Sequence, residues 1–128
     1  MSLRADPSKL MVHHVAIEVA ADVVRVAQAF RGAGAFSRGE QMVRAALSVS
    51  SNIAEACGRG TQREFRHYIA IARGSAQELL SQLRVSELVK TSPAGLRVLR
   101  SVQSRTVLVI KMLSRLDASP PPLREPDA

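Results

Sequence analysis

Residues 61–83 read TQREFRHYIAIARGSAQELLSQL, and the pattern of this stretch decides the fold class of the chain. Apolar side chains recur at alternating steps of four and three residues, which places them on one stripe of an α-helix. Thr61 is followed three residues later by Glu64, the spacing of a capping box that starts a helix. The stretch predicts an amphipathic helix from Thr61 to near Lys90. Its core stripe comprises Phe65, Ile69, Ala72, Ala76, Leu79 and Leu83.

The chain before residue 61 predicts two more amphipathic helices. The first runs from Leu10 to Arg31, with a core stripe of Val12, Ala16, Val19, Val23, Val26 and Phe30. The second runs from Ser37 to about Cys57, with a core stripe of Met42, Ala46, Val49, Ile53 and Ala56. Ser37 and Glu40 form a second capping box. The glycines of Gly58-Arg59-Gly60 predict a left-handed stop after this helix.

A fourth helix is predicted to begin at Ser92 and Pro93, an N-cap residue followed by proline at the first helical position. Its core stripe is Leu99, Val102, Thr106, Val109, Leu113 and Leu116. The run Ser119-Pro120-Pro121-Pro122 cannot continue a helix. Short connections make neighbouring helices antiparallel. We therefore expect an all-α, antiparallel, up-down-up-down four-helix bundle over residues 9–117, with disordered segments at 1–8 and 118–128.

The amino-acid composition indicates what kind of protein this chain is. A chain of 128 residues that is 46% hydrophobic can bury one core. Its 3% aromatic content suits closely packed helices better than a ligand pocket, so we expect no small-molecule substrate. Cys57 is the single cysteine, which favours a reducing compartment. The first residues lack a signal-peptide pattern and no stretch approaches a membrane span, so we expect a cytoplasmic protein without membrane contact.

The predicted first helix carries more apolar surface than one core stripe requires. The extra residues are Val15, Ile17, Ala20, Val24 and Ala27. On a small domain, surplus apolar surface of this kind marks a partner interface. Homo-oligomerisation is our hypothesis from this pattern.

Arginine gives the chain a formal net charge of +7, which favours an acidic partner such as RNA or DNA. The predicted fourth helix has no acidic residue between Pro93 and Leu116, and its basic residues are Arg97, Arg100, Arg105, Lys111 and Arg115. A second basic stripe, on the predicted third helix, comprises Arg66, Arg73 and Arg84. If these helices lie side by side, the stripes would form a sequence-independent phosphate surface. The alternative is a solvated face, or one paired with acids of a neighbouring subunit. Readout of bases is not predicted, because no aromatic residues are interleaved.

Two residue patterns resemble those of catalytic or metal-binding sites. Glu64 and His67 have the Glu-x-x-His spacing of carboxylate di-iron bundles, but the chain has no second such pair, so we expect no metal and no cofactor. A group of polar residues near the core lines consists of Asn52, Glu55, Ser75 and Glu78. No histidine or second carboxylate completes a relay there, so we interpret the group as a hydrogen-bond network that fixes helix register. We interpret Gly74, inside a helix, as a site of close backbone approach.

Several linked motifs carry a family resemblance. They are Gln41-Met-Val-Arg-Ala-Ala-Leu-Ser-Val-Ser-Ser-Asn-Ile-Ala-Glu55, Gly58-Arg59-Gly60, Glu64-Phe65, and Ile71-Ala72-Arg73-Gly74-Ser75 with Glu78-Leu79. Over Lys9–Leu116 the chain resembles the bacterial four-helix-bundle proteins first noticed in intervening sequences of large-subunit ribosomal RNA genes. The motif positions include Ser51, Asn52, Glu55, Gly58, Gly60, Gly74, Ser75 and Glu78. The chain departs from the family pattern at Ser50, where proline is common, and at Ala56, where glycine is common.

The resemblance implies a ring-like homopentamer without enzymatic activity. It also implies relatives among the accessory proteins of diversity-generating retroelements, some of which bind a reverse transcriptase and nucleic acid. We expect a non-enzymatic oligomeric scaffold or adaptor that binds RNA, DNA or a nucleic-acid-processing protein through basic helix surfaces. The alternative is a purely protein-binding module that makes no contact with nucleic acid.

Overall fold

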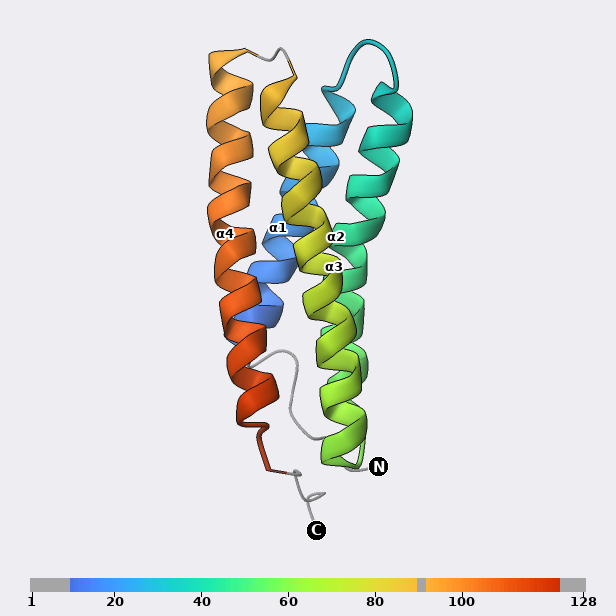
Figure 1. Ribbon diagram of the computed structural model, residues 1–128, viewed down its shortest axis with the longest axis vertical. Helices are drawn as coiled ribbons and strands as arrows, with labels where there is room; N and C mark the ends of the chain where they lie inside the picture. Colours follow the sequence, from blue (N-terminus) through green and yellow to red (C-terminus); the bar gives the residue numbers. More distant parts are fainter. Residues whose placement is uncertain (1–9, 90–91, 123–128) are drawn as a thin grey trace.

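The computed structural model describes residues 10–89 and 92–122, and within these ranges the chain is all α-helix with no strand. The helices are α1 (Met11–Gln28), α2 (Ala35–Cys57), α3 (Gln62–Leu88) and α4 (Pro93–Ala118), as Figure 1 shows. The predicted all-α class and its four helices are confirmed. The segments expected to be disordered lie partly outside the described residues.

The helices run alternately up and down, and each packs against its neighbours in chain order, with α4 returning to α1 (Figure 1). No contacts join the diagonal pairs α1 with α3 or α2 with α4 in the described part of the chain. The α1–α2 and α3–α4 connections therefore lie at one end of the bundle, which we call the loop end. The α2–α3 connection lies at the other end, together with the start of α1 and the end of α4.

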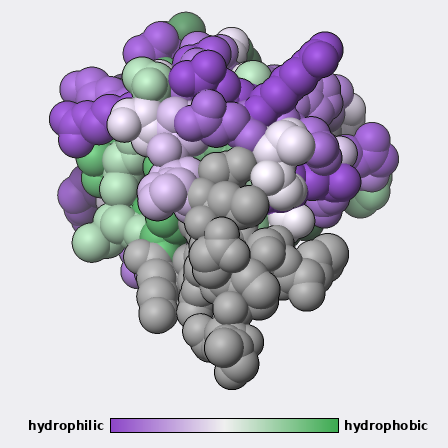
Figure 2. Space-filling model, turned by 90° about the horizontal axis from the view of Figure 1, so that it is seen from below, coloured by the Kyte–Doolittle hydropathy of each residue, from purple (hydrophilic) through white to green (hydrophobic). Residues whose placement is uncertain are grey.

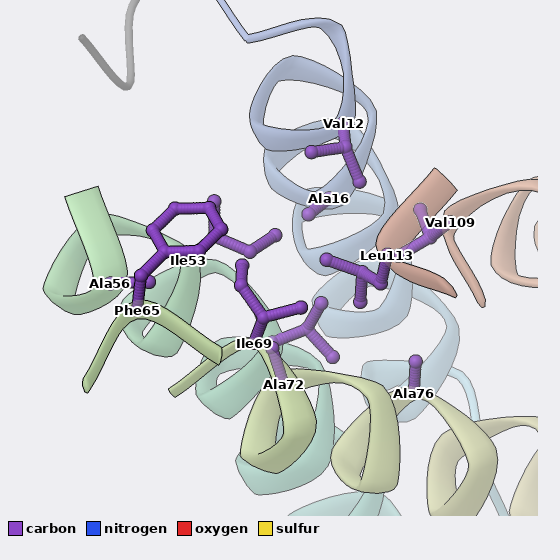
Figure 3. Packing of buried hydrophobic residues seen from close by; sticks show 11 residues of the cluster. Val12, Ala16, Ile53, Ala56, Phe65, Ile69, Ala72, Ala76, Val109 and Leu113 are labelled. Carbon is purple, nitrogen blue, oxygen red and sulfur yellow. The ribbon is translucent and has the colours of Figure 1, made fainter. Parts of the chain in front are cut away.

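The core fills the space between the helices in two clusters along the bundle axis. The cluster far from the loop end contains residues of all four helices, including Phe65, which is fully buried and lies beside Ile53 and Ala56 of α2 (Figure 3). The cluster near the loop end is aliphatic and is built around Val23, Met42, Leu83 and Val102. Burial of apolar area at about 25 cal/mol per Å² is the main force holding such helices together.

The predicted core stripes of α2 and α3 are buried at every position. On α4, Leu99 through Leu113 are buried as predicted, whereas Leu116 is only partly covered. The prediction for the first helix was partly wrong. Val26, inside α1, and Phe30, beyond its end at Gln28, are half-buried and pack against the core cluster, and Ala20, which we expected outside the core line, is buried within it.

Two of the predicted helix starts are confirmed by cap hydrogen bonds. The backbone N–H of Glu64 donates to Thr61 Oγ1 at 3.1 Å, and that of Gly95 donates to Ser92 Oγ at 3.0 Å. The capping box at Ser37 was wrong. Gly34, in a left-handed conformation with φ of 71°, precedes α2 and starts the helix at Ala35, so Ser37 already lies in the first turn.

The predicted left-handed stop after α2 was also wrong. Gly58 ends that helix with φ of −84°, and the described glycines with positive φ are Gly32 and Gly34 in the α1–α2 connection. The connection from α2 to α3 therefore closes through a helical turn, in which the N–H of Gly58 donates to the carbonyl of Glu55. None of the described helices combines the length and the apolar character that crossing a lipid bilayer requires.

Candidate nucleic-acid interface

The basic stripe of α3 and part of the basic stripe of α4 lie on one side of the molecule, because α3 and α4 pack against each other in antiparallel register. Two polar contacts fix that register. Glu87, near the end of α3, lies beside Arg100 near the start of α4, and Arg73 lies beside Asp117 near the end of α4. Whether each basic side chain is available to a ligand depends on the contacts that it makes within the chain.

Arg100 is neutralised within the chain. Its Nε donates to Glu87 Oε1 at 2.9 Å, and Gln103 donates to the other oxygen of the same carboxylate at 2.8 Å. The hydrogen bond from Gln103, followed by that from Arg100, lowers the pKa of Glu87 below its ordinary value. Gln103 was missed by the sequence reading, because a neutral amide carries no charge signal.

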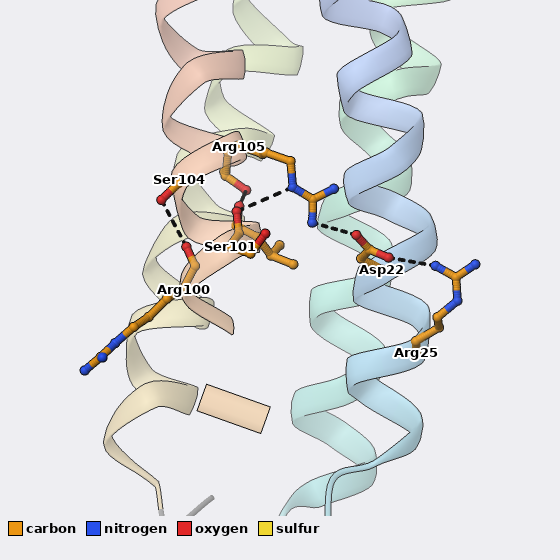
Figure 4. Close-up of polar contacts among 8 residues, drawn as sticks. Asp22, Arg25, Arg100, Ser101, Ser104 and Arg105 are labelled. Carbon is orange, nitrogen blue, oxygen red and sulfur yellow. Dashed lines mark hydrogen bonds and ion pairs between the residues drawn. The ribbon is translucent and has the colours of Figure 1, made fainter. Parts of the chain in front are cut away.

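Arg105 is neutralised as well, by a carboxylate on a different neighbouring helix. Its Nη2 lies 2.6 Å from Asp22 Oδ2 on α1, and Arg25 Nη1 lies 2.7 Å from Oδ1 of the same carboxylate (Figure 4). The hydrogen bond from Arg105 is the largest cause of the lowered pKa of Asp22. Arg105 thus joins α4 to α1 and points away from the side shared with α3.

Arg66 and Arg73 of α3 both reach the end of α4 at Asp117. Arg66 Nε donates to the backbone carbonyl of Asp117 at 2.9 Å. Arg73 Nη1 lies 3.9 Å from Asp117 Oδ2, a loose ion pair. A cation near the C-terminus of a helix also interacts favourably with the helix dipole. These two side chains therefore help to fasten α3 to α4.

The other four of the eight predicted cations have exposed side chains and no ion pair within the described residues. They are Arg84, Arg97, Lys111 and Arg115. Arg97, Lys111 and Arg115 lie on the exposed stripe of α4, and Arg84 lies near the end of α3. The structure therefore divides the predicted surface into cations that hold helices together and cations that remain unpaired. We call the latter the free basic set.

The polar motif residues between α2 and α3 form a smaller network than the sequence suggested. Ser75 Oγ lies 2.8 Å from Ser48 Oγ, and Asn52 Nδ2 donates to the Ser48 hydroxyl at 3.1 Å and to its carbonyl at 2.9 Å. The Ser48–Ser75 contact joins α2 to α3, whereas both hydrogen bonds of Asn52 stay within α2. The two glutamates do not join this network, since Glu55 pairs with Arg59 and Glu78 accepts a hydrogen bond from Gln82.

Arg59 is a structural residue that the sequence reading missed. It pairs with Glu55, lies 3.8 Å from Glu64 Oε2, and donates to the hydroxyl of Tyr68 at 3.1 Å. Its guanidinium carbon lies 4.7 Å from the centroid of the Tyr68 ring. Arg59 follows Glu55 by four residues, and this spacing, which favours an ion pair on a helix, could have indicated the contact from the sequence. Arg59 fastens the α2–α3 connection to α3.

The close backbone approach expected at Gly74 is not made within the described part of one chain, because a Cβ placed on this residue would meet nothing within 4 Å. The close approach occurs instead at Gly39, where a Cβ would meet the Cβ of Ala27 at 3.2 Å. Ser51 is exposed on the outer side of α2, and Gly60 lies in the α2–α3 connection.

Glu64 and His67 do not assemble a metal centre with other residues of the described chain. Glu64 is occupied by the cap at Thr61, and the His67 ring stands edge-on to Tyr68, with 5.1 Å between centroids. No group of three or more His, Cys, Asp or Glu side chains able to hold a metal ion occurs among residues 10–89 and 92–122.

Comparison with known proteins gives a match over most of the chain. Residues 8–115 match the model of the 23S rRNA-intervening sequence protein family. A solved structure of a protein of unknown function from the S23 ribosomal protein family of Bacteroides thetaiotaomicron superposes with a TM-score of 0.72 at 18% identity, covering 85% of this chain and 100% of that one. At that identity the likeness concerns the fold alone. No curated protein matches the chain.

Proposed function

Because the chain belongs to the 23S rRNA-intervening sequence protein family, we propose that it is a non-enzymatic, homo-oligomeric adaptor that binds the phosphate backbone of nucleic acid. The observation that carries the proposal is the free basic set. Its four side chains are exposed, and no described carboxylate of the same chain neutralises them.

The mechanism is electrostatic. Guanidinium and ammonium groups on the exposed stripe of α4 bind phosphate oxygens and release the counterions condensed on the nucleic acid. Arg97, Lys111 and Arg115 spread along that helix over 18 residues, or about 27 Å at 1.5 Å per residue. That span matches several phosphates of one strand. The contacts carry no sequence information, so we propose binding without base readout.

Oligomerisation would multiply this surface. Ile17 and Val24, one above the other on α1, remain 48% and 36% exposed after the chain has folded. Of the other surplus apolar residues, Ala20 is buried and Val15 packs against the core. We propose that the Ile17 and Val24 face is covered by a second copy. The pentameric ring that the family resemblance implies remains part of this proposal.

Light scattering and salt-dependent binding test the proposal together. The native species is sized first, and an end-labelled RNA duplex is then titrated with it at stepped salt concentrations. We expect a mass several times that of one chain and an affinity that falls steeply as salt rises, because each neutralised phosphate of a duplex contributes about −0.9 to the log–log slope. A monomeric mass contradicts the oligomer. Failure to bind at low salt contradicts the nucleic-acid part and favours the purely protein-binding module.

A further inference from the structure

The loop end of the bundle exposes large apolar side chains that the fold does not use. Phe36, at the start of α2, is 84% exposed, and Leu88, the last residue of α3, is 90% exposed. Val85 and Val89 nearby are 53% and 41% exposed. Figure 2 views the opposite end, where hydrophilic residues occupy much of the visible surface and a hydrophobic area lies on one side. Several large apolar side chains exposed at one end of a small domain favour an interaction site there.

Two hollows flank Arg38 at this end. The first, of about 210 Å³, lies between α2 and α3 and is lined by residues that include Met42 and Val85. The second, of about 320 Å³, lies under the connections and is lined by residues that include Phe30 and Val89. Arg38 and Ser86 line both hollows, so a single docking segment could occupy the two together.

The charge at this site is positive, and no described carboxylate of the chain forms an ion pair with it. The Arg38 guanidinium stacks over the Phe30 ring, 4.9 Å from its centroid, and forms no ion pair within the described residues. Arg31, which lines the second hollow, donates to the backbone carbonyls of Gln28 and Phe30 at 3.0 and 2.8 Å. Both guanidiniums retain donors that can meet a carboxylate.

The first hollow also holds an unused hydrogen-bond acceptor. Gln82 lines it, and Gln82 Oε1 is buried without a hydrogen-bond partner in the described chain, while Nε2 donates to Glu78. A buried amide oxygen without a donor costs roughly 1–3 kcal/mol, which an N–H from a docking chain would recover. This group indicates that a peptide, with its backbone donors, fits the hollow.

We propose that the loop end docks an acidic, apolar segment of a partner protein, with its apolar side chains in the hollows and its carboxylates on Arg31 and Arg38. The described residues of a second copy of the chain are a poor source of those carboxylates. Glu18 and Glu78 are the only described acids without an ion pair, and both lie in the middle of helices. The inference goes beyond the proposed nucleic-acid function, because it uses none of the free basic set.

The test uses a labelled two-heptad peptide with leucine on one helix face and glutamate on the other. Two further peptides replace either the glutamates by lysine or the leucines by serine. Fluorescence anisotropy is measured with the native oligomer and with two variants on one face of α3. The first of these variants, Val85→Glu, places a carboxylate in the first hollow of the proposed docking site. Ile71→Glu, 14 residues earlier and 39% exposed, is the matched control. Arg38→Glu is a third variant.

We expect the leucine–glutamate peptide alone to bind, and Val85→Glu and Arg38→Glu to weaken it about tenfold or more while Ile71→Glu does not. RNA binding by Val85→Glu should equal that of the parent. Equal binding of the serine–glutamate or leucine–lysine peptide would overturn the proposal, as would displacement of the peptide by RNA or by vesicles of anionic lipid. A change of oligomer mass in Val85→Glu without peptide binding by the parent would show that a second copy covers the site, which also overturns it.

Discussion

Arg105 Nη2 lies 2.6 Å from Asp22 Oδ2, so one of the arginines on α4 joins that helix to α1. The two residues are 83 positions apart in the chain. Their side chains are 28% and 29% exposed, which leaves them partly shielded from water and salt. The contact matters because α1 and α4 form the least extensive of the helix pairings.

Replacing Asp22 by Asn should lower the free energy of unfolding by about 1 kcal/mol at neutral pH, the scale of a partly shielded ion pair. The pKa of Asp22 is lowered from 3.8 in the folded protein. Its contribution is therefore complete above about pH 4 and is lost as the pH falls through the lowered folded-state pKa. Urea unfolding of parent and variant should show a difference at pH 7 that shrinks below pH 4. Glu18→Gln, on the same helix without an ion pair, is the control and should differ little from the parent at either pH.

Two glycine substitutions should have opposite signs. Gly74→Ala should raise the free energy of unfolding by about 0.5–1 kcal/mol, because the added methyl meets open space and alanine is the better helix former. Gly39→Ala should lower it, since the new Cβ would lie 3.2 Å from that of Ala27. Thermal and urea unfolding check both variants. Destabilisation by Gly74→Ala would mean that another chain approaches α3 at this point.

The helix caps give a third prediction. Thr61→Ala should cost about 1 kcal/mol, because it removes the acceptor for the N–H of Glu64. Ser37→Ala should be close to neutral, since α2 begins at Ala35 and the serine makes no cap hydrogen bond. Equal costs for the two variants in urea unfolding would contradict the helix start seen here.

The proposed subunit interface predicts that Ile17→Glu combined with Val24→Glu lowers the native mass. Each substitution places a carboxylate on an apolar position that remains 48% or 36% exposed in the single chain, so the fold itself should tolerate it. Light scattering measures the mass, and circular dichroism should show the same helix content as the parent. Leu47→Glu on α2, 49% exposed, is the matched control. An unchanged mass in the double variant would remove α1 from the interface.

Periodicity alone predicted most of this fold. The stripe from Phe65 to Leu83 and the caps at Thr61 and Ser92 are local features, and local features can be read from a sequence. The start of α2 could not be predicted from local sequence features. Glycine at residue 34 permits a left-handed backbone but does not require it, and Ser37 offered an equally good local pattern.

The basic stripes were predicted as residue positions but not as an available surface. Whether an arginine is free depends on carboxylates brought near by packing, such as Asp22 for Arg105 and Asp117 for Arg73. No spacing rule reaches from α4 to α1 across the chain. The helical face of Gly74 was predictable, but the absence of a neighbour there follows only from the way the four helices are arranged.

The most direct measurement of the central claim is the affinity of an RNA duplex for two charge-reversal variants. One carries Lys111→Glu and Arg115→Glu in the free basic set. The other carries Arg44→Glu and Arg63→Glu, which change the net charge equally on α2 and α3 at exposed side chains. We predict that the α4 variant binds at least about tenfold more weakly and that its salt slope is smaller by about 2, while the control stays near the parent. Equal losses in the two variants, or no loss in either, would contradict a nucleic-acid surface on α4.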